Sequence, residues 1–164
     1  MKKKGLEVEI RDAHEADQDG ILEIEGGCFP GPEGLTRSQL RTLYGNRDFH
    51  FIVAEELNAR KIEGLAIYLA EGTEAKLITI DVPASARRKG IGSSLLRAVE
   101  ERALRGGALK MVLEVRESNG AALFLYKSAG YMPVGEIPNY YFYPVKGSRK
   151  AIVMEKRLGR KKIP

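Results

Sequence analysis

The hydrophobic positions of this chain follow two periods, one typical of strands and one typical of helices. Apolar runs of roughly four to eight residues predict strands, and apolar positions three and four residues apart predict helices. Strands that alternate with helices predict an α/β fold built on a mixed sheet. The expected strands are residues 6–10, 49–55, 62–69, 75–82, 110–115 and 151–154, with one more before the last, and the expected helices are residues 15–28, 36–44, 90–105 and a short one ended by Gly130.

The helix expected at residues 90–105 has the clearest pattern. Its apolar side chains fall on one stripe, and the Gly106-Gly107 pair that follows is typical of a helix end. Thr36 stands where the preceding helix needs a capping side chain. We expect the stripe to face the core; its residues are Ile91, Leu95, Leu96, Val99 and Ala103.

Length and charge limit the class of protein. The chain has 164 residues, and we expect a single domain over residues 1–164. The net charge is +5, but eight cations lie near the two ends, so the rest of the chain carries about −3. We therefore expect basic tails at residues 1–5 and 159–164, which could steer the protein toward an RNA-rich partner such as the ribosome. Nothing in the sequence resembles a base-reading motif, and both tails lack aromatic residues among their cations, so we expect any nucleic acid contact to be made through the tails alone.

The cysteine and histidine content and the hydropathy of the chain argue against disulfide-linked, metal-binding and membrane proteins. A single cysteine, Cys28, permits no internal disulfide, which favours a reducing cytoplasm. His14 and His50 are far from each other in the sequence, so no metal site is expected. No apolar run approaches the ~18 residues of a membrane span, and the segment after residues 2–4 is too charged for a signal peptide. We expect a cytoplasmic protein without membrane contact.

The segment between the fourth expected strand and the following helix is a candidate anion site. Residues 87–92 read Arg-Arg-Lys-Gly-Ile-Gly, so three cations precede two glycines that open the helix. Free N–H groups and the positive dipole end of a helix start attract phosphate. A P-loop would need a lysine after the second glycine, and a Rossmann fingerprint would need Gly or Ala where this chain has Leu95. Both nucleotide folds therefore fit poorly.

Residues 87–92 resemble the acetyl-CoA-binding motif Arg/Gln-x-x-Gly-x-Gly/Ala of the GCN5-related N-acetyltransferases (GNAT). Residues 113–131 are similar to a second signature, that of the ribosomal-protein-alanine acetyltransferase (RimI-like) branch of this superfamily, and the resemblance covers about residues 6–158. It implies an α/β (α+β) fold, the GNAT fold, with a mixed central sheet of roughly six to seven strands, flanked by about four helices. It also implies that central strands part to admit acetyl-CoA, the cosubstrate.

The resemblance implies two catalytic residues. Acetyl transfer from a thioester needs a neutral amine and a proton for the departing thiolate. Glu114 corresponds to the family's base and Tyr126 to its acid. Glu114 lies in an apolar strand, where a carboxylate is costly unless it is paired or solvated, so the structural alternative is an ion pair with Arg97 or Arg116. The alternative for Tyr126 is a core aromatic residue.

Contacts with the cofactor and the acceptor follow from the same resemblance. Asp81 is atypical, because the family usually carries a small or apolar residue there. Its side chain must point away from the anionic cofactor, either toward the incoming amine or into a cross-strand ion pair. The implied acceptor contacts are Glu25, Phe29, Tyr140 and Tyr141. The implied cofactor contacts are Ile80, Asp81, Val82, Arg87, Arg88, Lys89, Gly90, Ile91, Gly92, Ser93, Asn119 and Tyr126.

The predicted function is acetylation of protein N-termini by direct transfer from acetyl-CoA. The family's Phe-Pro-Trp after the first helix is replaced here by Phe29-Pro30-Gly31-Pro32, which leaves ribosomal-protein and broader Ard1-like substrates open. A lysine, polyamine or other small-amine acetyltransferase is the enzyme alternative, because a fold does not fix the acceptor. A non-catalytic acetyl-CoA or RNA-associated module is the second alternative. We expect Cys28 to be a buried apolar residue rather than a covalent acetyl carrier.

Overall fold

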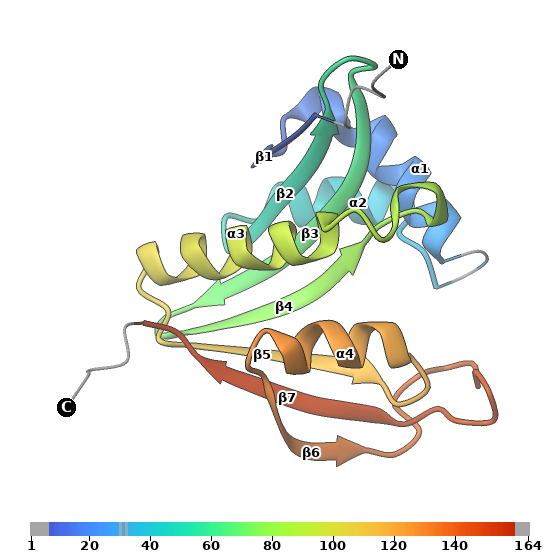
Figure 1. Ribbon diagram of the computed structural model, residues 1–164, viewed down its shortest axis with the longest axis vertical. Coiled ribbons are helices and arrows are strands. Elements are labelled where there is room, and N and C mark those ends of the chain that lie inside the picture. The colour runs from blue at the N-terminus through green and yellow to red at the C-terminus, as the bar shows by residue number, and fades with distance from the viewer. Residues whose placement is uncertain (1–6, 30, 32, 160–164) are drawn as a thin grey trace, which may run out of the picture. The chain divides into compact units, whose positions relative to one another are not determined.

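The computed structural model describes residues 7–29, 31 and 33–159, and it confirms the α/β class with a mixed seven-stranded sheet in the order β1-β2-β3-β4-β5-β7-β6 (Figure 1). The basic segments at residues 1–5 and 160–164 lie outside the described residues. Two short 3-10 turns accompany the main elements, at Glu15–Asp17 and Ala84–Ala86. The strands are β1 (Val8–Asp12), β2 (Phe49–Glu56), β3 (Lys61–Glu71), β4 (Glu74–Asp81), β5 (Lys110–Arg116), β6 (Met132–Ile137) and β7 (Ala151–Arg157), and the helices are α1 (Gln18–Cys28), α2 (Arg37–Tyr44), α3 (Ile91–Arg105) and α4 (Gly120–Ser128).

The sheet combines both kinds of strand pairing. β4 pairs with β5 in parallel, with Glu74 opposite Lys110 and Leu77 opposite Leu113. β1 pairs with β2, β5 with β7, and β6 with β7, all antiparallel. The parting of central strands that the family resemblance implies stays a prediction.

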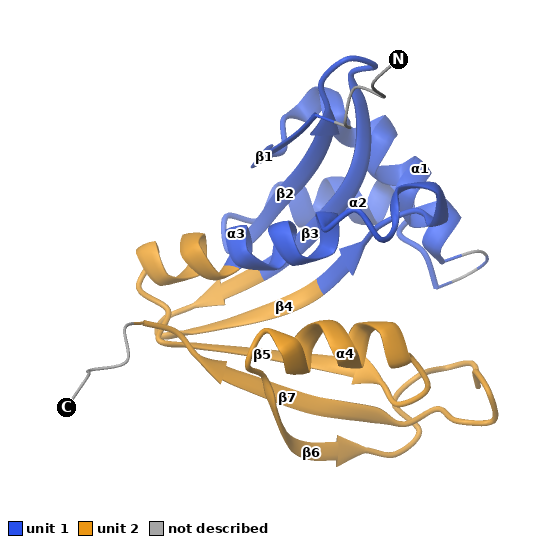
Figure 2. Ribbon diagram, in the orientation of Figure 1, with its two compact units in different colours: residues 1–68, 79–99 blue, residues 69–78, 100–164 orange. Residues whose placement is uncertain are grey.

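The chain divides into two compact units (Figure 2). The first comprises residues 1–68 and 79–99, and the second comprises residues 69–78 and 100–164. The prediction of a single domain over the whole chain stays a prediction. The first unit has a core in which α1 and α2 pack against the sheet, formed by Ile21, Ile24, Leu40, Phe51, Val53, Leu65 and Ile67.

The apolar stripe predicted for α3 is confirmed, since all five of its side chains are at most 4% exposed. The sequence allows α3 to approach β3 closely because β3 carries a glycine at the contact. A Cβ atom on Gly64 would lie 2.8 Å from Cγ2 of Ile91 and 2.9 Å from Cδ1 of Leu95. The predicted cap of α2 is also confirmed, because the Thr36 hydroxyl accepts a hydrogen bond from the Gln39 N–H at 3.2 Å.

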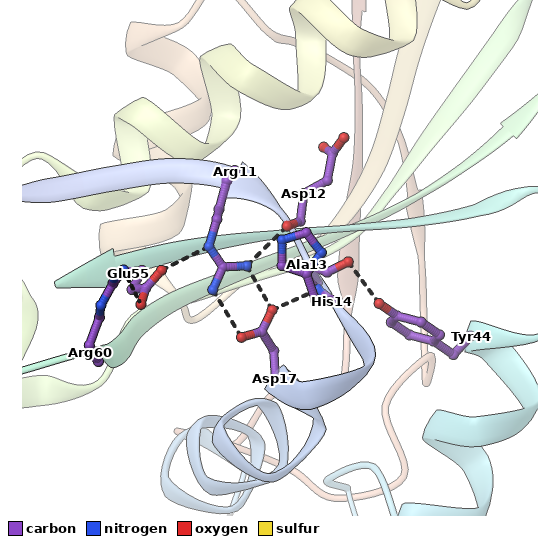
Figure 3. A network of polar contacts seen from close by, with 8 residues as sticks. All are labelled: Arg11, Asp12, Ala13, His14, Asp17, Tyr44, Glu55 and Arg60. Carbon is purple, nitrogen blue, oxygen red and sulfur yellow. Dashed lines mark hydrogen bonds and ion pairs between the residues drawn. The ribbon is translucent and has the colours of Figure 1, made fainter. Parts of the chain in front are cut away.

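A polar network in the first unit ties β1 to α1 and β2 (Figure 3). The Arg11 guanidinium donates to both carboxylate oxygens of Asp17, at 2.7 and 3.0 Å, and its Nε donates to Glu55 at 2.8 Å. The Arg11 hydrogen bond holds the pKa of Asp17 below its ordinary value. Asp17 also accepts from the His14 N–H at 2.6 Å, which forms the tight turn before α1. The helix predicted at residues 15–28 therefore begins as a 3-10 turn and becomes α-helical at Gln18.

Two of the eight cations counted near the chain ends, Lys156 and Arg157, belong to the sheet instead. Lys156 lies in β7, and its ammonium is 2.7 Å from the Glu100 carboxylate. This ion pair is partly buried, with side-chain exposures of 27% and 15%. Lys156 is therefore neutralised within the second unit and does not extend the basic tail. In the described part of the chain no helix is long and apolar enough to cross a membrane.

Candidate active site

The candidate phosphate-binding loop lies in the first unit, between β4 and α3. The backbone angle φ changes sign along the loop, from −67° at Arg87 to +62° at Arg88, and it is again positive, +78°, at Gly90. Alternation of this kind turns successive N–H groups toward one concave side and makes an anion-binding nest. The Ser94 N–H bonds to the Gly90 carbonyl at 3.0 Å, which opens α3 and leaves the N–H groups of its first turn without helical partners. The backbone of this loop therefore has a shape that suits an anion, and the binding of cofactor phosphates there stays a prediction.

The cationic side chains of this loop make contacts within it. The Arg87 Nε donates to the Val82 carbonyl at 2.9 Å, and the Lys89 ammonium donates to the Ser85 carbonyl at 3.1 Å. Both side chains are exposed, as is that of Arg88. The loop thus combines a preformed backbone with a local positive charge, which suits a diphosphate.

Two buried carboxylates lie close to each other in the first unit. Asp81, at the end of β4, and Glu25, on α1, are each 3% exposed. The Thr79 hydroxyl donates to Oδ1 of Asp81 at 2.8 Å, and the Leu35 N–H donates to Glu25 at 3.2 Å. Burial, together with the charge of Glu25, raises the pKa of Asp81 to about 8. The cross-strand ion pair, one of the two alternatives for Asp81, is wrong, because the charged group beside Asp81 is another acid, Glu25.

Cys28 and Phe29 end α1 beside these acids. Cys28 is half-buried, whereas the sequence predicted a buried apolar residue. Burial, reinforced by the nearby Asp81, raises the pKa of its thiol. A raised pKa disfavours the thiolate, which is the nucleophilic form, and so argues against a covalent acetyl carrier here. Phe29 is half-buried, and its N–H bonds to the Glu25 carbonyl at 2.8 Å.

The predicted base lies in the second unit and has a partner that sequence analysis missed. The Glu114 carboxylate on β5 is 2.9 Å from the ammonium of Lys76 on β4. The structural alternative of an ion pair named Arg97 or Arg116 as the partner, whereas the ion pair seen here is with Lys76. The parallel register places Lys76 opposite Val112, so its side chain reaches the next outward position of β5 on the same face. Burial, the largest single influence, lowers the pKa of Lys76, but the hydrogen bond to Glu114 and the negative charge of that carboxylate together outweigh it, so the pKa is raised.

The predicted acid, Tyr126, lies on α4 in the second unit. It is 7% exposed, and its ring meets that of Tyr131 edge to face at 5.8 Å. Asn119 caps α4, since its Oδ1 accepts from the Ala122 N–H at 3.1 Å. This leaves the amide NH₂ of Asn119 as the group that could donate to the cofactor arm. The catalytic role of Tyr126 stays a prediction.

The two tyrosines predicted to contact the acceptor form an aromatic corner in the second unit. Tyr140 and Tyr141 meet edge to face at 5.0 Å, and Asn139 before them adopts a φ of +54°. The Arg116 guanidinium lies 3.8 Å from the centre of the Tyr141 ring and donates to the Tyr143 carbonyl at 2.8 Å. Arg116 therefore connects β5 to the aromatic corner through a cation–π contact and a hydrogen bond.

The predicted site residues are divided between the two units. Glu25, Phe29 and residues 80–93 belong to the first, whereas Glu114, Asn119, Tyr126, Tyr140 and Tyr141 belong to the second. In the described part of the chain no group of three or more His, Cys, Asp or Glu residues could hold a metal. A pocket of about 370 Å³ in the second unit contains none of the predicted residues; it is lined by Glu117, Leu123, Lys127, Pro133, Gly135, Glu136 and Ile152.

The family is established by comparison with known proteins. Residues 19–131 match the acetyltransferase (GNAT) family, which is more than half of the chain. The chain therefore belongs to the GNAT family of acetyltransferases. Enzymes of this family use acetyl-CoA as their cosubstrate.

Individual members of the family and solved structures are similar to this chain over most of its length. The chain is 44% identical over 130 residues to N-alpha-acetyltransferase RimI of Mycobacterium tuberculosis, covering 77% of this chain and 79% of that protein. It is 31% identical over 133 residues to the [ribosomal protein bS18]-alanine N-acetyltransferase of Salmonella typhimurium, covering 81% and 84%. The crystal structure of the Escherichia coli ribosomal-protein-S18-alanine N-acetyltransferase is similar with a TM-score of 0.82 at 25% identity, covering 96% of this chain and 97% of that one. Ard1 from Thermoplasma volcanium has the same fold, with a TM-score of 0.80 at 24% identity, covering 93% and 99%.

Proposed function

We propose that this protein is an N-terminal acetyltransferase that moves the acetyl group of acetyl-CoA to the α-amino group of a protein or peptide. The observation that carries the proposal is the 44% identity with an N-alpha-acetyltransferase over 77% of the chain. The relatives named for a ribosomal-protein alanine make a ribosomal N-terminus the first acceptor to test. A cytoplasmic location and RNA-directed basic tails remain predictions that accompany this proposal.

The proposed residue roles follow the chemistry of acyl transfer. The nest at residues 87–93 binds the diphosphate of acetyl-CoA, and the Asn119 amide donates to its pantetheine arm. Glu114 accepts the amine proton through a water molecule, and Lys76, 2.9 Å away, fixes the orientation of its carboxylate. Tyr126 donates a proton to the departing thiolate; a phenol with an ordinary pKa near ~10 is protonated at neutral pH and can do so.

The chemistry of the acceptor supports an α-amine over a lysine side chain. An α-amino group with a pKa near ~8 is about one tenth neutral at pH 7, whereas a lysine amine with a pKa near ~10.4 is neutral in only about one molecule in a few thousand. The α-amine therefore needs only a single carboxylate as its base. The raised pKa of Cys28 supports direct transfer, because it keeps the thiol protonated and so disfavours the thiolate that a covalent acetyl carrier would need.

Mass spectrometry of acetylated peptides tests the function. The substrates are a lysine-free peptide with a free N-terminus, an Nα-blocked peptide that contains lysine, and spermidine, each incubated with acetyl-CoA. We expect acetylation of the first peptide alone, at its α-amine. Faster acetylation of the blocked peptide or of spermidine would overturn the proposed acceptor, and no acetylation of any of them would favour a non-catalytic module.

A further inference from the structure

We propose that Asp81 and Glu25 together bind the protonated amino group of the acceptor, with Asp81 as a specificity-determining residue. The inference rests on the proposed function and extends it, because it names the group that recognises the acceptor's charge. It assigns the pair to binding and gives it no part in the proton transfer at Glu114.

The two carboxylates form an unusual buried pair within the first unit. They come from different elements, α1 and the end of β4, and each is 3% exposed. Buried carboxylates are normally matched by a cation or by several hydrogen-bond donors. Here the Thr79 hydroxyl donates to Asp81, the Leu35 N–H donates to Glu25, and the two acids hydrogen-bond to each other. A cation that replaces the proton shared by the two acids could therefore be accepted by both carboxylates.

One oxygen of the pair lacks a donor from the rest of the protein. Oδ2 of Asp81 is buried, and apart from the proton that Asp81 shares with Glu25 it has no hydrogen-bond partner in the described part of the chain. A buried oxygen with so few donors is destabilising, and a bound ion is one of the reasons why a native protein keeps one. An ammonium group offers three N–H donors and a positive charge, which is what a carboxylate pair with few donors requires.

The charged groups near Asp81 do not occupy the position that we assign to the acceptor's amino group. The titratable groups around Asp81 are Glu25 and Cys28 on α1, and Arg87 after β4. Arg87 is the one cation among them, but its Nε is bound to the Val82 carbonyl and it acts on the Cys28 thiol. The flanking Cys28, Ile80 and Val82 are half-buried rather than fully buried, so the pair lies directly beneath the surface of its unit.

Binding of a cation changes the protonation of the pair. In the free protein Asp81 keeps its proton at neutral pH, because burial and the charge of Glu25 raise its pKa to about 8. A bound ammonium compensates a second negative charge, so Asp81 ionises and one proton leaves for solvent. Acceptor binding near pH 7 should therefore release close to one proton that originates from Asp81.

Calorimetric titration measures this proton directly. A lysine-free acceptor peptide is titrated at pH 7 into the protein saturated with CoA, which cannot acetylate it, in buffers of different ionisation enthalpy. Wild type, Asp81→Asn and the matched control Asp48→Asn are compared; Asp48 is an exposed loop carboxylate outside the site. For wild type and the control we expect release of close to one proton per peptide. For Asp81→Asn we expect the release to be lost and the affinity to fall about tenfold, the value of one charge-assisted hydrogen bond.

Kinetics and a desamino peptide complete the test. We expect Asp81→Asn to raise the KM for peptide about tenfold while kcat stays within about twofold of wild type. A peptide that lacks the α-amino group should bind wild type and Asp81→Asn equally. Unchanged KM and unchanged proton release in Asp81→Asn would overturn the proposal, as would a desamino peptide that binds as tightly as its parent. If wild type acetylates the peptide in either of those cases, the proposed function stands and only this inference fails.

Folding of the variant can be checked without a substrate. Between about pH 4 and pH 8 the folded protein holds a proton on Asp81 that the unfolded chain has released, so this group lowers stability as the pH rises through that range. Asn at this position cannot ionise. We therefore expect Asp81→Asn to be at least as stable as wild type at pH 8, and a lower melting temperature there would contradict the buried neutral acid.

Discussion

Substitution of Gly64 by alanine should displace the start of α3. The added Cβ would lie 2.8 Å from Ile91, 2.9 Å from Leu95 and 3.3 Å from the Cβ of Ala54. Ile91 and Leu95 are 4% and 0% exposed, so neither can swing into solvent. Overpacking of this kind costs about 1–3 kcal/mol. At about 2–4 °C per kcal/mol for a chain of this length, a cost near 2 kcal/mol lowers the melting temperature by about 4–8 °C.

Differential scanning calorimetry measures the shift, and Gly26→Ala is the matched control. Gly26 lies in α1 with no atom within 4 Å of an added Cβ, so alanine there should be neutral or stabilising by up to about 1 kcal/mol. Because α3 opens directly after the phosphate loop, Gly64→Ala should also weaken acetyl-CoA binding. A Gly64→Ala protein that melts with wild type would refute the close packing of β3 on α3.

Three further predictions concern the proposed site and the Arg11 network. Glu114→Gln and Tyr126→Phe should each lower kcat by about 100-fold or more while leaving CoA affinity near that of wild type, and unchanged turnover in both would remove their assigned roles. Lys76→Met should change the free energy of unfolding by less than about 1 kcal/mol, because the pair is partly exposed, yet lower kcat; equal kcat would show that Lys76 does not orient Glu114. Arg11→Met should destabilise the protein by about 2–3 kcal/mol in urea at pH 7. Since Arg11 lowers the pKa of Asp17, this stabilisation is present at neutral pH and is lost as the pH falls below the ordinary carboxylate range, so a difference from wild type that persists undiminished near pH 2 would contradict the network.

The elements of this fold are predicted well by local signals. The stripe of α3 and the Thr36 cap depend on residues a few positions apart, and both are confirmed. The beginning of α1 is not predicted, because the turn at Glu15–Asp17 depends on Arg11 and thus on a contact with β1. The bounds of β6 are not predicted for a different reason. All six of its residues are exposed, so no alternation of buried and exposed positions marks where the strand begins and ends.

The candidate site shows what sequence patterns cannot supply. The glycine-opened loop is local, so its residues could be named in advance. The partner of Glu114 could not, because Lys76 reaches it through the parallel register of β4 and β5, which local spacing does not encode. The neighbour of Asp81 is likewise set by how α1 packs on the sheet, and the ion pair expected there is replaced by a second acid.

Titration of acetyl-CoA into wild type and Gly90→Val tests the central claim, that the loop at residues 87–93 binds the diphosphate of the cofactor. Gly90 has a φ of +78°, which valine adopts only with strain, so the nest should lose its shape while no atom lies within 4 Å to clash with the new Cβ. The account predicts one-to-one binding by wild type and an affinity about tenfold or more lower for Gly90→Val, with circular dichroism unchanged. Equal affinity of the two proteins, or no binding of acetyl-CoA by wild type, would contradict it.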